Sequence, residues 1–474
     1  MLAARLVGVL AAATVLPAAT SATPALAQAA PAKARPNVVF VVADTLRHDQ
    51  VGFNGEGSNR TPFLDSLAAR AVVFDRAYSQ CPWTNPSVAS MFTSRYVTQH
   101  GVTTFASPIS QDEQTLAEVL RSNGYATGAA VANILIQPIL GFAQGFHDFR
   151  VVGPKVENEL TKGKGEEVNA AALAWIDSLP KDGKPIFLYA HYMETHIPYL
   201  PPDDLLSSAL AGRPRPDPAV MNALLYNRPD NLTPEQVDTA RLLYEVGVSD
   251  LDRQVRSLFE GLARRGILEN SVVVFAADHG EEFYERKWWG HGKSLFNQAI
   301  RVPLFVVPPH GQARRDVSEN VELIDIAPTI LGLLGIAPPS PYQGRPLLRP
   351  DGSPSLSREP HPGSGASFLA QQQDFAGSEL VASPDSQARM GPKRTVLVGD
   401  RKLIADTEGH LEYYDLSRDP MELNPVRDFD AIPLTMHLAL DAFRQRVRSR
   451  AATGGGTAID PATKERMRAL GYAQ

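Results

Sequence analysis

The chain of 474 residues contains a single cysteine, Cys81. One cysteine cannot form a disulfide within the chain, and it cannot build a metal site from thiolates. An excess of positive charge is also absent, because 46 basic residues against 52 acidic ones give a formal net charge of -6. Since binding a polyanion normally requires a positive field, we expect no nucleic-acid partner.

Apolar segments long enough to cross a membrane are absent as well. The N-terminal apolar stretch, residues 6–16, falls short of the ~20 residues that a spanning helix needs, so no stable transmembrane anchor is expected. It follows an arginine and precedes Ala25-Leu26-Ala27, a cleavage site of the small-x-small type. These features predict a secretory signal peptide over residues 1–27, and hence a secreted or periplasmic protein. The mature chain would start near Gln28, with residues 28–36 as a leader.

The composition of the chain, with 43% hydrophobic and 21% charged residues, is typical of a large globular protein. This composition excludes disorder, collagen and coiled coil. Apolar runs without alternation, which are typical of strands buried on both faces of a parallel sheet, occur at residues 37–42, 186–190, 272–277 and 302–307. Helical patterns occur at residues 115–123, 166–179 and 234–265. Strands that alternate with helices predict an α/β sandwich with a mainly parallel central sheet.

The domain boundaries follow changes in composition. Residues 199–230 are rich in proline and predict an excursion on the surface, and residues 349–393 begin with a segment rich in proline, serine and glycine. Short β-like segments and a helical pattern at 433–450 follow. We therefore predict a catalytic domain over 37–348, a loop or linker over 349–393, and a small α+β C-terminal subdomain over 394–474.

Two of the predicted strands end in residues that can bind a cation. The first strand is followed by Asp44, and the strand at 272–277 is followed by Asp278 and His279. In an open parallel sheet the carboxyl ends of the strands face the ligand crevice, so these oxygen and imidazole groups can meet at one ion. Each motif alone also fits a turn or a helix cap. Their joint occurrence favours a site.

The segment from Cys81 to Tyr96 carries a second kind of chemistry. Thr84 suits a helix N-cap, Pro86 suits the first turn, and the residues to Phe92 suit a short helix. A hydroxyl at a helix N-terminus lies in positive potential, which favours its alkoxide and any anionic group that it attacks. The alternative is that Thr84 only caps the helix.

Taken together, these motifs resemble the sulfatase family of the alkaline-phosphatase-like superfamily, from about residue 35 to residue 334 with a C-terminal subdomain beyond. The resemblance implies the alkaline-phosphatase-like sandwich fold. The motifs that carry it are Arg35-Pro36-Asn37 with Asp44-Thr45-Leu46-Arg47, Thr61-Pro62-Phe63-Leu64-Asp65, Gly124-Tyr125-Ala126-Thr127, His196 before Pro198-Tyr199, Asp278-His279-Gly280-Glu281, Arg301-Val302-Pro303, Tyr414-Asp415-Leu416 with Asp419-Pro420, and Leu470-Gly471-Tyr472.

The nucleophile position departs from the family pattern. Sulfate hydrolases of the family carry a Cys or Ser that is oxidised to formylglycine, followed two residues on by Pro and four on by Arg. Alignment places Thr84 at the nucleophile, Pro86 at the Pro and Val88 at the Arg. Cys81 does not fit, because Trp83 stands where the Pro should be. Threonine cannot give formylglycine, since its oxidation would yield a ketone.

Other family positions have also changed. The usual second metal aspartate is Thr45 here, and the family's Lys-x-His is replaced by Ala132 and Ile134. Asp250 and Asp252 could supply further ligands, but they lie within a helical pattern and are assigned to its polar face. The sequence therefore predicts a single metal site.

A threonine nucleophile is similar to that of the superfamily's phosphodiesterases and phosphotransferases. The similarity implies one divalent ion, manganese, zinc, magnesium or calcium, held by Asp44, Thr84, Asp278 and His279. It further implies roles for three residues of the following loops. His196 and His291 would protonate the leaving oxygen or activate water, and Lys293 would neutralise a non-bridging oxygen.

The leading hypothesis is thus an exported, metal-dependent ester hydrolase that attacks a phosphoester through Thr84, with phosphodiesters and phosphonate monoesters favoured. The substrate would be a small-molecule, glycan or lipid ester. Two alternatives remain open: a sulfatase that works without formylglycine, and a non-catalytic relative that binds carbohydrate or lipid. The sequence indicates neither the natural alcohol nor the oligomeric state.

Overall fold

The computed structural model describes residues 35–55, 60–153, 162–226, 231–355, 375–380 and 392–447. The predicted signal peptide and residues 28–34 of the leader lie outside these ranges, as does the motif Leu470-Gly471-Tyr472. None of the described helices is both long and apolar enough to cross a lipid bilayer.

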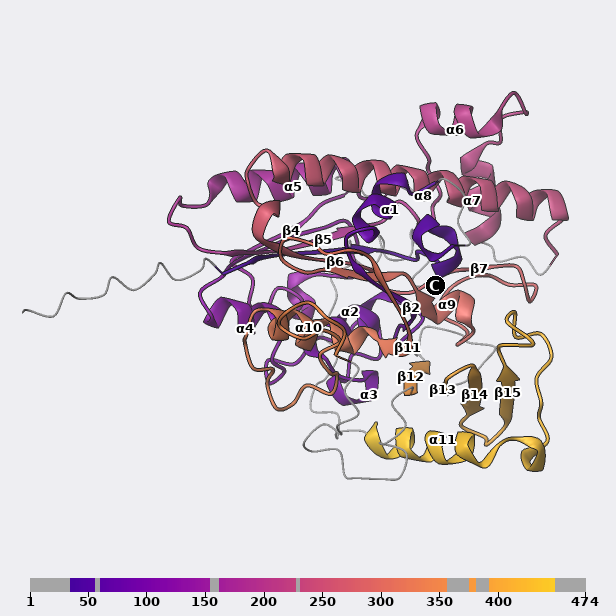
Figure 1. Cartoon of the computed structure of the whole chain (residues 1–474). Coiled ribbons are helices and arrows are strands. Elements are labelled where there is room, and N and C mark those ends of the chain that lie inside the picture. Colours follow the sequence, from indigo (N-terminus) through magenta and orange to yellow (C-terminus); the bar gives the residue numbers. More distant parts are fainter. Residues whose placement is uncertain are drawn as a thin grey trace, which may run out of the picture. The chain divides into compact units, whose positions relative to one another are not determined.

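Within the described residues, a nine-stranded mixed sheet forms the centre of the fold (Figure 1). Its main strand order is β11-β2-β10-β6-β1-β5-β3-β4, and β9 pairs with β2. The strands are β1 (Asn37–Ala43), β2 (Val72–Tyr78), β3 (Ala126–Val131), β4 (Asp148–Val151), β5 (Ile186–Tyr192), β6 (Ser271–Ala277), β9 (Arg301–Val302), β10 (Leu304–Val307) and β11 (Arg315–Glu322).

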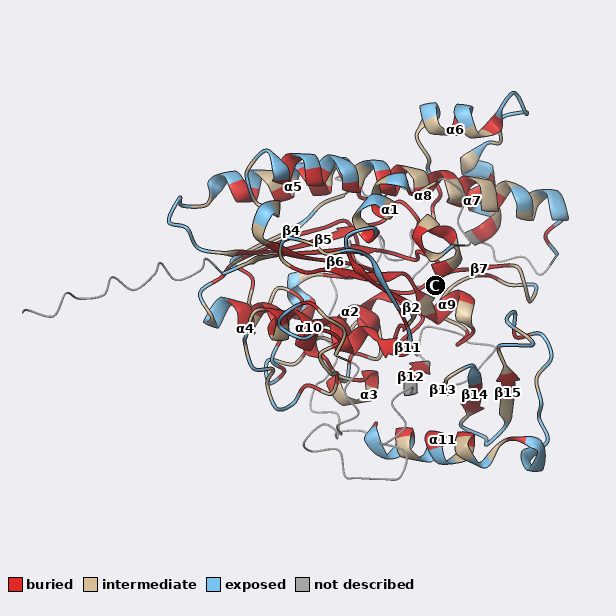
Figure 2. Ribbon diagram, viewed as in Figure 1, coloured by how far each residue is buried: buried red, intermediate tan, exposed pale blue. Residues whose placement is uncertain are grey.

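The three central strands are parallel and buried. Strand β1 pairs with β5 on one side and with β6 on the other, and both pairings extend to Ala43 at the end of β1. Strands β5 and β6 are buried along their whole lengths, which fits their mostly apolar sequences without alternation (Figure 2). The register brings the carboxyl ends of all three strands to one edge.

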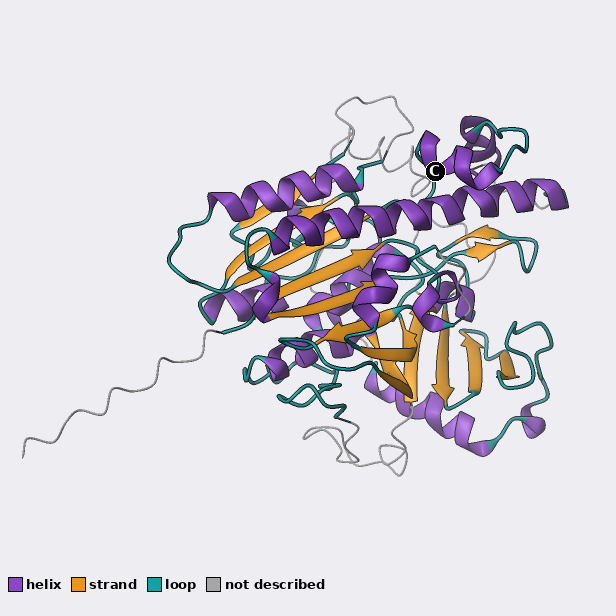
Figure 3. Cartoon of the chain, turned by 45° about the horizontal axis from the view of Figure 1, so that its top comes forward, coloured by secondary structure: helices purple, strands orange, loops and turns teal. Residues whose placement is uncertain are grey.

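Helices cover both faces of the sheet. Figures 1 and 3 show α1, α5 and α8 on one side and α2, α4 and α10 on the other. The helices are α1 (Pro62–Ala68), α2 (Thr84–Thr93), α3 (Val97–His100), α4 (Leu116–Ser122), α5 (Gly165–Ser178), α6 (Asp203–Leu210), α7 (Pro218–Tyr226), α8 (Pro234–Ala263), α9 (Asn297–Ile300), α10 (Ile326–Leu333) and α11 (Leu434–Arg446).

Most elements agree with the sequence expectations, and the differences have physical causes. Helices α4 and α8 begin at capping boxes in which Thr115 and Thr233 accept from the backbone N–H of the third helical residue. The expected strand at 302–307 is interrupted, because Pro303 cannot donate to a ladder, and β10 runs antiparallel to β6. The proline-rich stretch at 199–230 contains the two short helices α6 and α7.

A second sheet, antiparallel and four-stranded among the described residues, follows the catalytic domain in sequence. It consists of β12 (Phe375–Leu380), β13 (Lys393–Val398), β14 (Arg401–Asp406) and β15 (Leu411–Asp415), in that order. Helix α11 packs against it so closely that a Cβ atom on Gly377 would lie 2.5 Å from the Phe443 ring. The sheet therefore begins with a strand that lies inside the predicted linker.

A buried ion pair joins this second sheet to the catalytic domain. Lys402 of β14 and Glu422 lie 2.6 Å apart, and both side chains are fully buried. Each also bonds to Asn297 at the start of α9, since Lys402 donates to its side-chain oxygen and Glu422 accepts from its backbone N–H. The pair thus fixes the start of α9 to the C-terminal subdomain.

We expect Lys402→Met to lower the free energy of unfolding by about 3 kcal/mol, because it leaves the buried Glu422 carboxylate without its counter-charge. Urea denaturation of the purified protein measures the change. Arg427→Met is the matched control, since Arg427 pairs with Glu412 on the surface and should cost less than about 1 kcal/mol. Equal losses for the two variants would contradict this account of the buried pair.

Candidate active site

Three neighbouring strands bring acidic and imidazole groups together at one edge of the central sheet. Asp44 follows β1, His191 lies near the end of β5, and Asp278 follows β6. All three side chains are fully buried, and their potential ligand atoms lie within 4.8 Å of one another. The strand-end argument from the sequence therefore placed Asp44 and Asp278 correctly, but it did not select His191.

Each of the two carboxylates is held by one of its oxygens. The Oδ2 atom of Asp44 accepts from the Asn133 amide at 2.5 Å and lies 3.1 Å from His191 Nε2. The Oδ1 atom of Asp278 accepts from the backbone N–H groups of Thr45, at 3.1 Å, and His279, at 2.8 Å. The remaining oxygens, Asp44 Oδ1 and Asp278 Oδ2, are buried and make no hydrogen bond within the described residues.

His279 lies beside both of these unpaired oxygens. Its Nε2 atom is 3.8 Å from Asp44 Oδ1 and 3.5 Å from Asp278 Oδ2. Its Nδ1 atom lies 3.0 Å from the carbonyl of Gly280, which can accept the Nδ1 proton and leave the Nε2 lone pair directed at the carboxylates.

Thr84 is the first residue of α2, and the N-cap is Trp83. This corrects the expectation that Thr84 caps the helix, because the helix starts one residue earlier than predicted. The Thr84 hydroxyl lies instead 3.3 Å from His279 Nε2 and 3.5 Å from the Asn133 amide nitrogen. The four predicted ligands therefore lie together: Asp44, Thr84 and Asp278 surround the Nε2 atom of the fourth, His279.

The pKa values of the two buried aspartates are shifted in opposite directions. Burial opposes ionisation of Asp44, but the imidazoles of His196, His191 and His279 hold its pKa well below the usual range. Burial and the neighbouring charge of Asp44 raise the pKa of Asp278 well above normal. Burial also lowers the pKa of His279 to about 3, which keeps its nitrogen unprotonated.

These residues fit a divalent cation. Two buried carboxylate oxygens without partners, a hydroxyl and a neutral imidazole nitrogen converge on one place, and such a donor set suits manganese, zinc, magnesium or calcium. A cation there would remove the repulsion that now separates the pKa values of Asp44 and Asp278. His191 could bind the cation as well, or it could orient Asp44 through its contact with Oδ2. The Tyr189 hydroxyl holds the other side of the His191 ring, at 2.8 Å from Nδ1.

Two further histidines, His196 and His291, lie against this cluster. The ring of His291 is centred 4.6 Å from that of His279 and 5.0 Å from that of His196. Glu281 holds His291 through a contact of 2.9 Å to Nδ1 and is itself fixed by the Tyr199 hydroxyl at 3.0 Å. Glu281 therefore orients the His291 ring beside His279 and His196.

Comparisons with known proteins identify the family of the chain. The family model described as Sulfatase matches residues 36–336, which is more than half of the chain. The chain belongs to the sulfatase family. An arylsulfatase from Clostridium perfringens is 22% identical over 82% of this chain and 89% of the relative. The chain is thus a hydrolase that acts on ester bonds.

Solved structures of family members share the fold. A putative sulfatase from Bacteroides thetaiotaomicron has a TM-score of 0.71, with 19% identity over 90% of this chain and 96% of that one. A phosphonate monoester hydrolase of Agrobacterium radiobacter has a TM-score of 0.68, with 19% identity over 87% of this chain and 96% of that one. One scaffold therefore serves both sulfatases and phosphonate hydrolases among these relatives.

Several sulfatase positions carry residues that cannot bind an anion or a metal here. Val88 and Ala132 are fully buried in the hydrophobic core, and Ile134 is buried as well. Thr45 directs its hydroxyl to the Thr195 carbonyl at 2.8 Å, so its oxygen has a structural use. Cys81 is buried among apolar residues, in a cluster with Trp83 and Val97.

Two other expectations need adjustment in the light of the contacts. Lys293 lies with its ammonium 3.9 Å from the centre of the Trp288 ring, a cation–π contact that the sequence did not indicate. Asp250 and Asp252 are on α8, as expected, but they are buried rather than on a solvated face. Asp252 accepts from the first turn of α1, and Asp250 accepts from Arg253.

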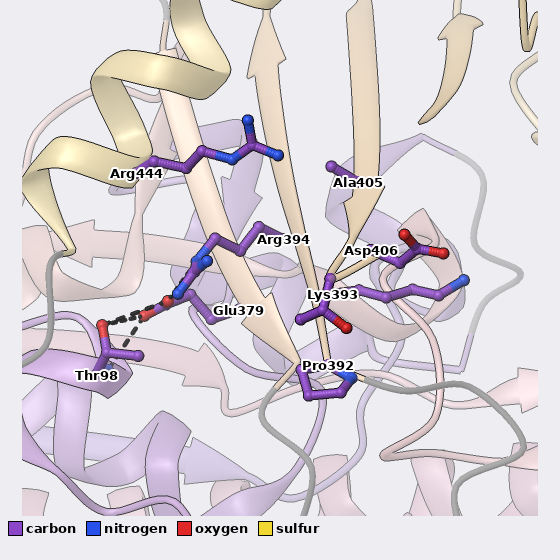
Figure 4. A pocket seen from close by; sticks show the side chains of 9 residues that line it. Thr98, Glu379, Pro392, Lys393, Arg394, Ala405, Asp406 and Arg444 are labelled. Atoms are coloured by element: carbon purple, nitrogen blue, oxygen red, sulfur yellow. Dashed lines mark hydrogen bonds and ion pairs between the residues drawn. The ribbon is translucent and has the colours of Figure 1, made fainter. Parts of the chain in front are cut away.

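A pocket and a second acidic cluster also lie among the described residues, outside the active site. A pocket of about 70 Å³ on the second sheet is lined by Glu379, Arg394 and Arg444 (Figure 4). Glu379 is already paired with Arg394 and bonded to Thr98, so its charge is satisfied. Asp406, Glu408 and His410 cluster on the turn between β14 and β15, where half-buried or exposed carboxylates commonly occur without an ion.

We expect the purified protein to contain about one divalent ion per chain, and Asp278→Asn to lose most of it, because one of the two anionic ligands is removed. Elemental analysis after gel filtration measures the metal content. Asp406→Asn serves as the control in the other acidic cluster and should retain the ion. Full retention by Asp278→Asn would exclude Asp278 from the site.

Proposed function

We propose that the chain hydrolyses a phosphodiester or a phosphonate monoester by using the unmodified Thr84 hydroxyl as the nucleophile. The observation that carries the proposal is the position of Thr84, whose oxygen lies 3.3 Å from His279 Nε2 beside the two unpaired carboxylate oxygens. A hydroxyl that only capped α2 would have no reason to lie among these groups. Retention of Asp44, Asp278 and His279 around it argues against a non-catalytic role.

The bound cation would be held by Asp44, Thr84, Asp278 and His279, where it would lower the pKa of the hydroxyl and screen the charge of the ester. With its proton released to solvent, the Thr84 oxygen would attack phosphorus, forming a bond to phosphorus as the bond to the alcohol breaks. His291 would give a proton to the leaving oxygen, because burial holds the pKa of His196 well below normal and so suits that imidazole to accept a proton instead. Water activated by one of them subsequently cleaves the phosphoryl-threonine.

The charge of the site favours a monoanionic substrate. The family's arginine and lysine are replaced by Val88 and Ala132, both buried in the apolar core. A phosphodiester or phosphonate monoester carries one negative charge, whereas a phosphomonoester carries up to two and needs more cationic partners. A site with fewer cations therefore suits the singly charged ester.

The nucleophile itself argues in the same direction. A sulfated formylglycine hydrate releases sulfate by breaking its own hemiacetal, a route that a sulfated threonine lacks. A sulfated Thr84 would have to wait for water to attack sulfur, whereas for a phosphorylated Thr84 a bound cation would screen the negative charge that the water must approach. The alternative, a sulfatase that acts without formylglycine, is supported by the arylsulfatase relative.

We expect kcat/KM for an aryl phosphodiester or an aryl phosphonate monoester to exceed that for the matching aryl sulfate by at least roughly tenfold, a difference of about 1.4 kcal/mol in barrier. Thr84→Ala should abolish both activities, and Thr84→Ser should keep part of them because it keeps the hydroxyl. Steady-state assays with each metal provide the measurement.

Thr93→Ala is the control for these variants, because Thr93 lies at the other end of α2 and bonds only to the carbonyl of Ala89 within the described residues. It should retain nearly full activity. A preference for aryl sulfate under every metal would overturn the phosphoester assignment and leave the sulfatase alternative in its place.

We also propose that the enzyme is exported, on the evidence of the N-terminal sequence. N-terminal sequencing of protein recovered from the periplasm or the medium should begin close to Gln28, since the apolar stretch and the small-x-small site predict cleavage there. Active protein confined to the cytoplasm with Met1 intact would rule this out.

A further inference from the structure

A lysine that no motif indicated lies buried beside the active site. Lys162 precedes α5 and has only 9% of its surface exposed. Its ammonium donates to the carbonyl oxygen of Glu194 at 2.9 Å and to that of His196 at 2.5 Å. One side chain therefore holds the backbone on both sides of Thr195, in the loop that carries a predicted catalytic histidine.

Two glycines allow this lysine to reach the loop. A Cβ atom on Gly163 would lie 2.9 Å from the Cβ of Ala132 and 2.8 Å from the carbonyl oxygen of Val152. A Cβ atom on Gly165 would lie 2.8 Å from the Glu194 carboxylate. The sequence Lys162-Gly163-Lys164-Gly165 thus passes through a space that admits no side chain at either glycine, directly against the position where the family has its lysine.

The carboxylates near Lys162 favour the charged form of its ammonium group. Burial lowers its pKa to about 8, while the carboxylates of Glu194, Asp250, Asp44 and Glu281 act in the opposite direction. Asp44 and Glu281 belong to the active site, so the ammonium is within electrostatic reach of it. The same charge disfavours protonation of His196, whose pKa burial holds well below normal.

We propose that Lys162 is a positioning residue that fixes the loop bearing His196 and adds one buried positive charge beside the active site, which still has fewer cations than the family pattern because of Ala132 and Ile134. The proposal rests on the proposed function in one respect, that the substrate is an anionic ester. The charge would attract that anion, and the two hydrogen bonds would set the position of the imidazole.

The two effects can be separated by substitution. Lys162→Met removes both the charge and the hydrogen bonds, whereas Lys162→Gln removes the charge but keeps an amide that can donate. Lys164→Met is the matched control, because Lys164 is two residues away, is a lysine and has a side chain that is 72% exposed. Each variant is assayed as the full-length, metal-loaded enzyme.

We expect Lys162→Met to raise the inhibition constant of inorganic phosphate by roughly tenfold, as loss of one nearby charge implies, and to lower kcat as well. Lys162→Gln should show the same loss of phosphate affinity with a smaller loss of kcat. Lys164→Met should stay within twofold of the unaltered enzyme. Melting temperatures and metal contents, measured in parallel, identify effects on folding and on the cation.

A folded Lys162→Met whose phosphate inhibition constant and kcat/KM stay within twofold of the unaltered enzyme would overturn the proposal. A lower melting temperature with unchanged phosphate affinity would also overturn it, because that is the result of a purely structural lysine. Where Lys162→Met does not fold, the phosphate affinity of Lys162→Gln decides. If aryl sulfate is the preferred substrate, the same comparison with sulfate ion tests Lys162 while the phosphoester assignment fails separately.

Discussion

The repulsion between two buried carboxylates is the constraint on which the active site depends. Asp44 and Asp278 are placed side by side because β1 and β6 are adjacent, parallel and in register to their last residues. Each uses one oxygen for hydrogen bonds and leaves the other without a partner. Such an arrangement is unfavourable alone and would become favourable with a bound cation, which the imidazole of His279 and the hydroxyl of Thr84 would help to hold.

The same constraint explains what the sequence could predict. Asp44, Asp278 and His279 follow directly on continuous apolar strands, and the pairing rules of a parallel sheet are enough to bring such residues to one edge. Thr84 was found through its position relative to Pro86 and the helix that follows. His196 and His291 were found only through family resemblance, because a loop histidine has no periodicity that fixes its place.

Sequence patterns did not predict the residues that hold other site residues in place. Asn133 and His191 hold the second oxygen of Asp44, yet an asparagine after one strand and a histidine inside another are unremarkable in a single sequence. His191 could have been selected, since it lies at the end of the predicted strand beside Asp44. The role of Glu281 in holding His291 depends on a contact across the loop, which only the folded chain reveals.

The second sheet contains none of the predicted catalytic residues, yet it touches both segments that carry them. Ser378 and Glu379 of β12 bond to the backbone of Ser79 and Gln80, just before the nucleophile segment. At the other side the buried pair of Lys402 and Glu422 holds Asn297, a short way along the chain from His291. The C-terminal subdomain therefore bonds to the chain near both Thr84 and His291, the proposed nucleophile and the proposed proton donor. A chimaera that exchanged this subdomain for that of a relative would inherit the relative's spacing of the two groups.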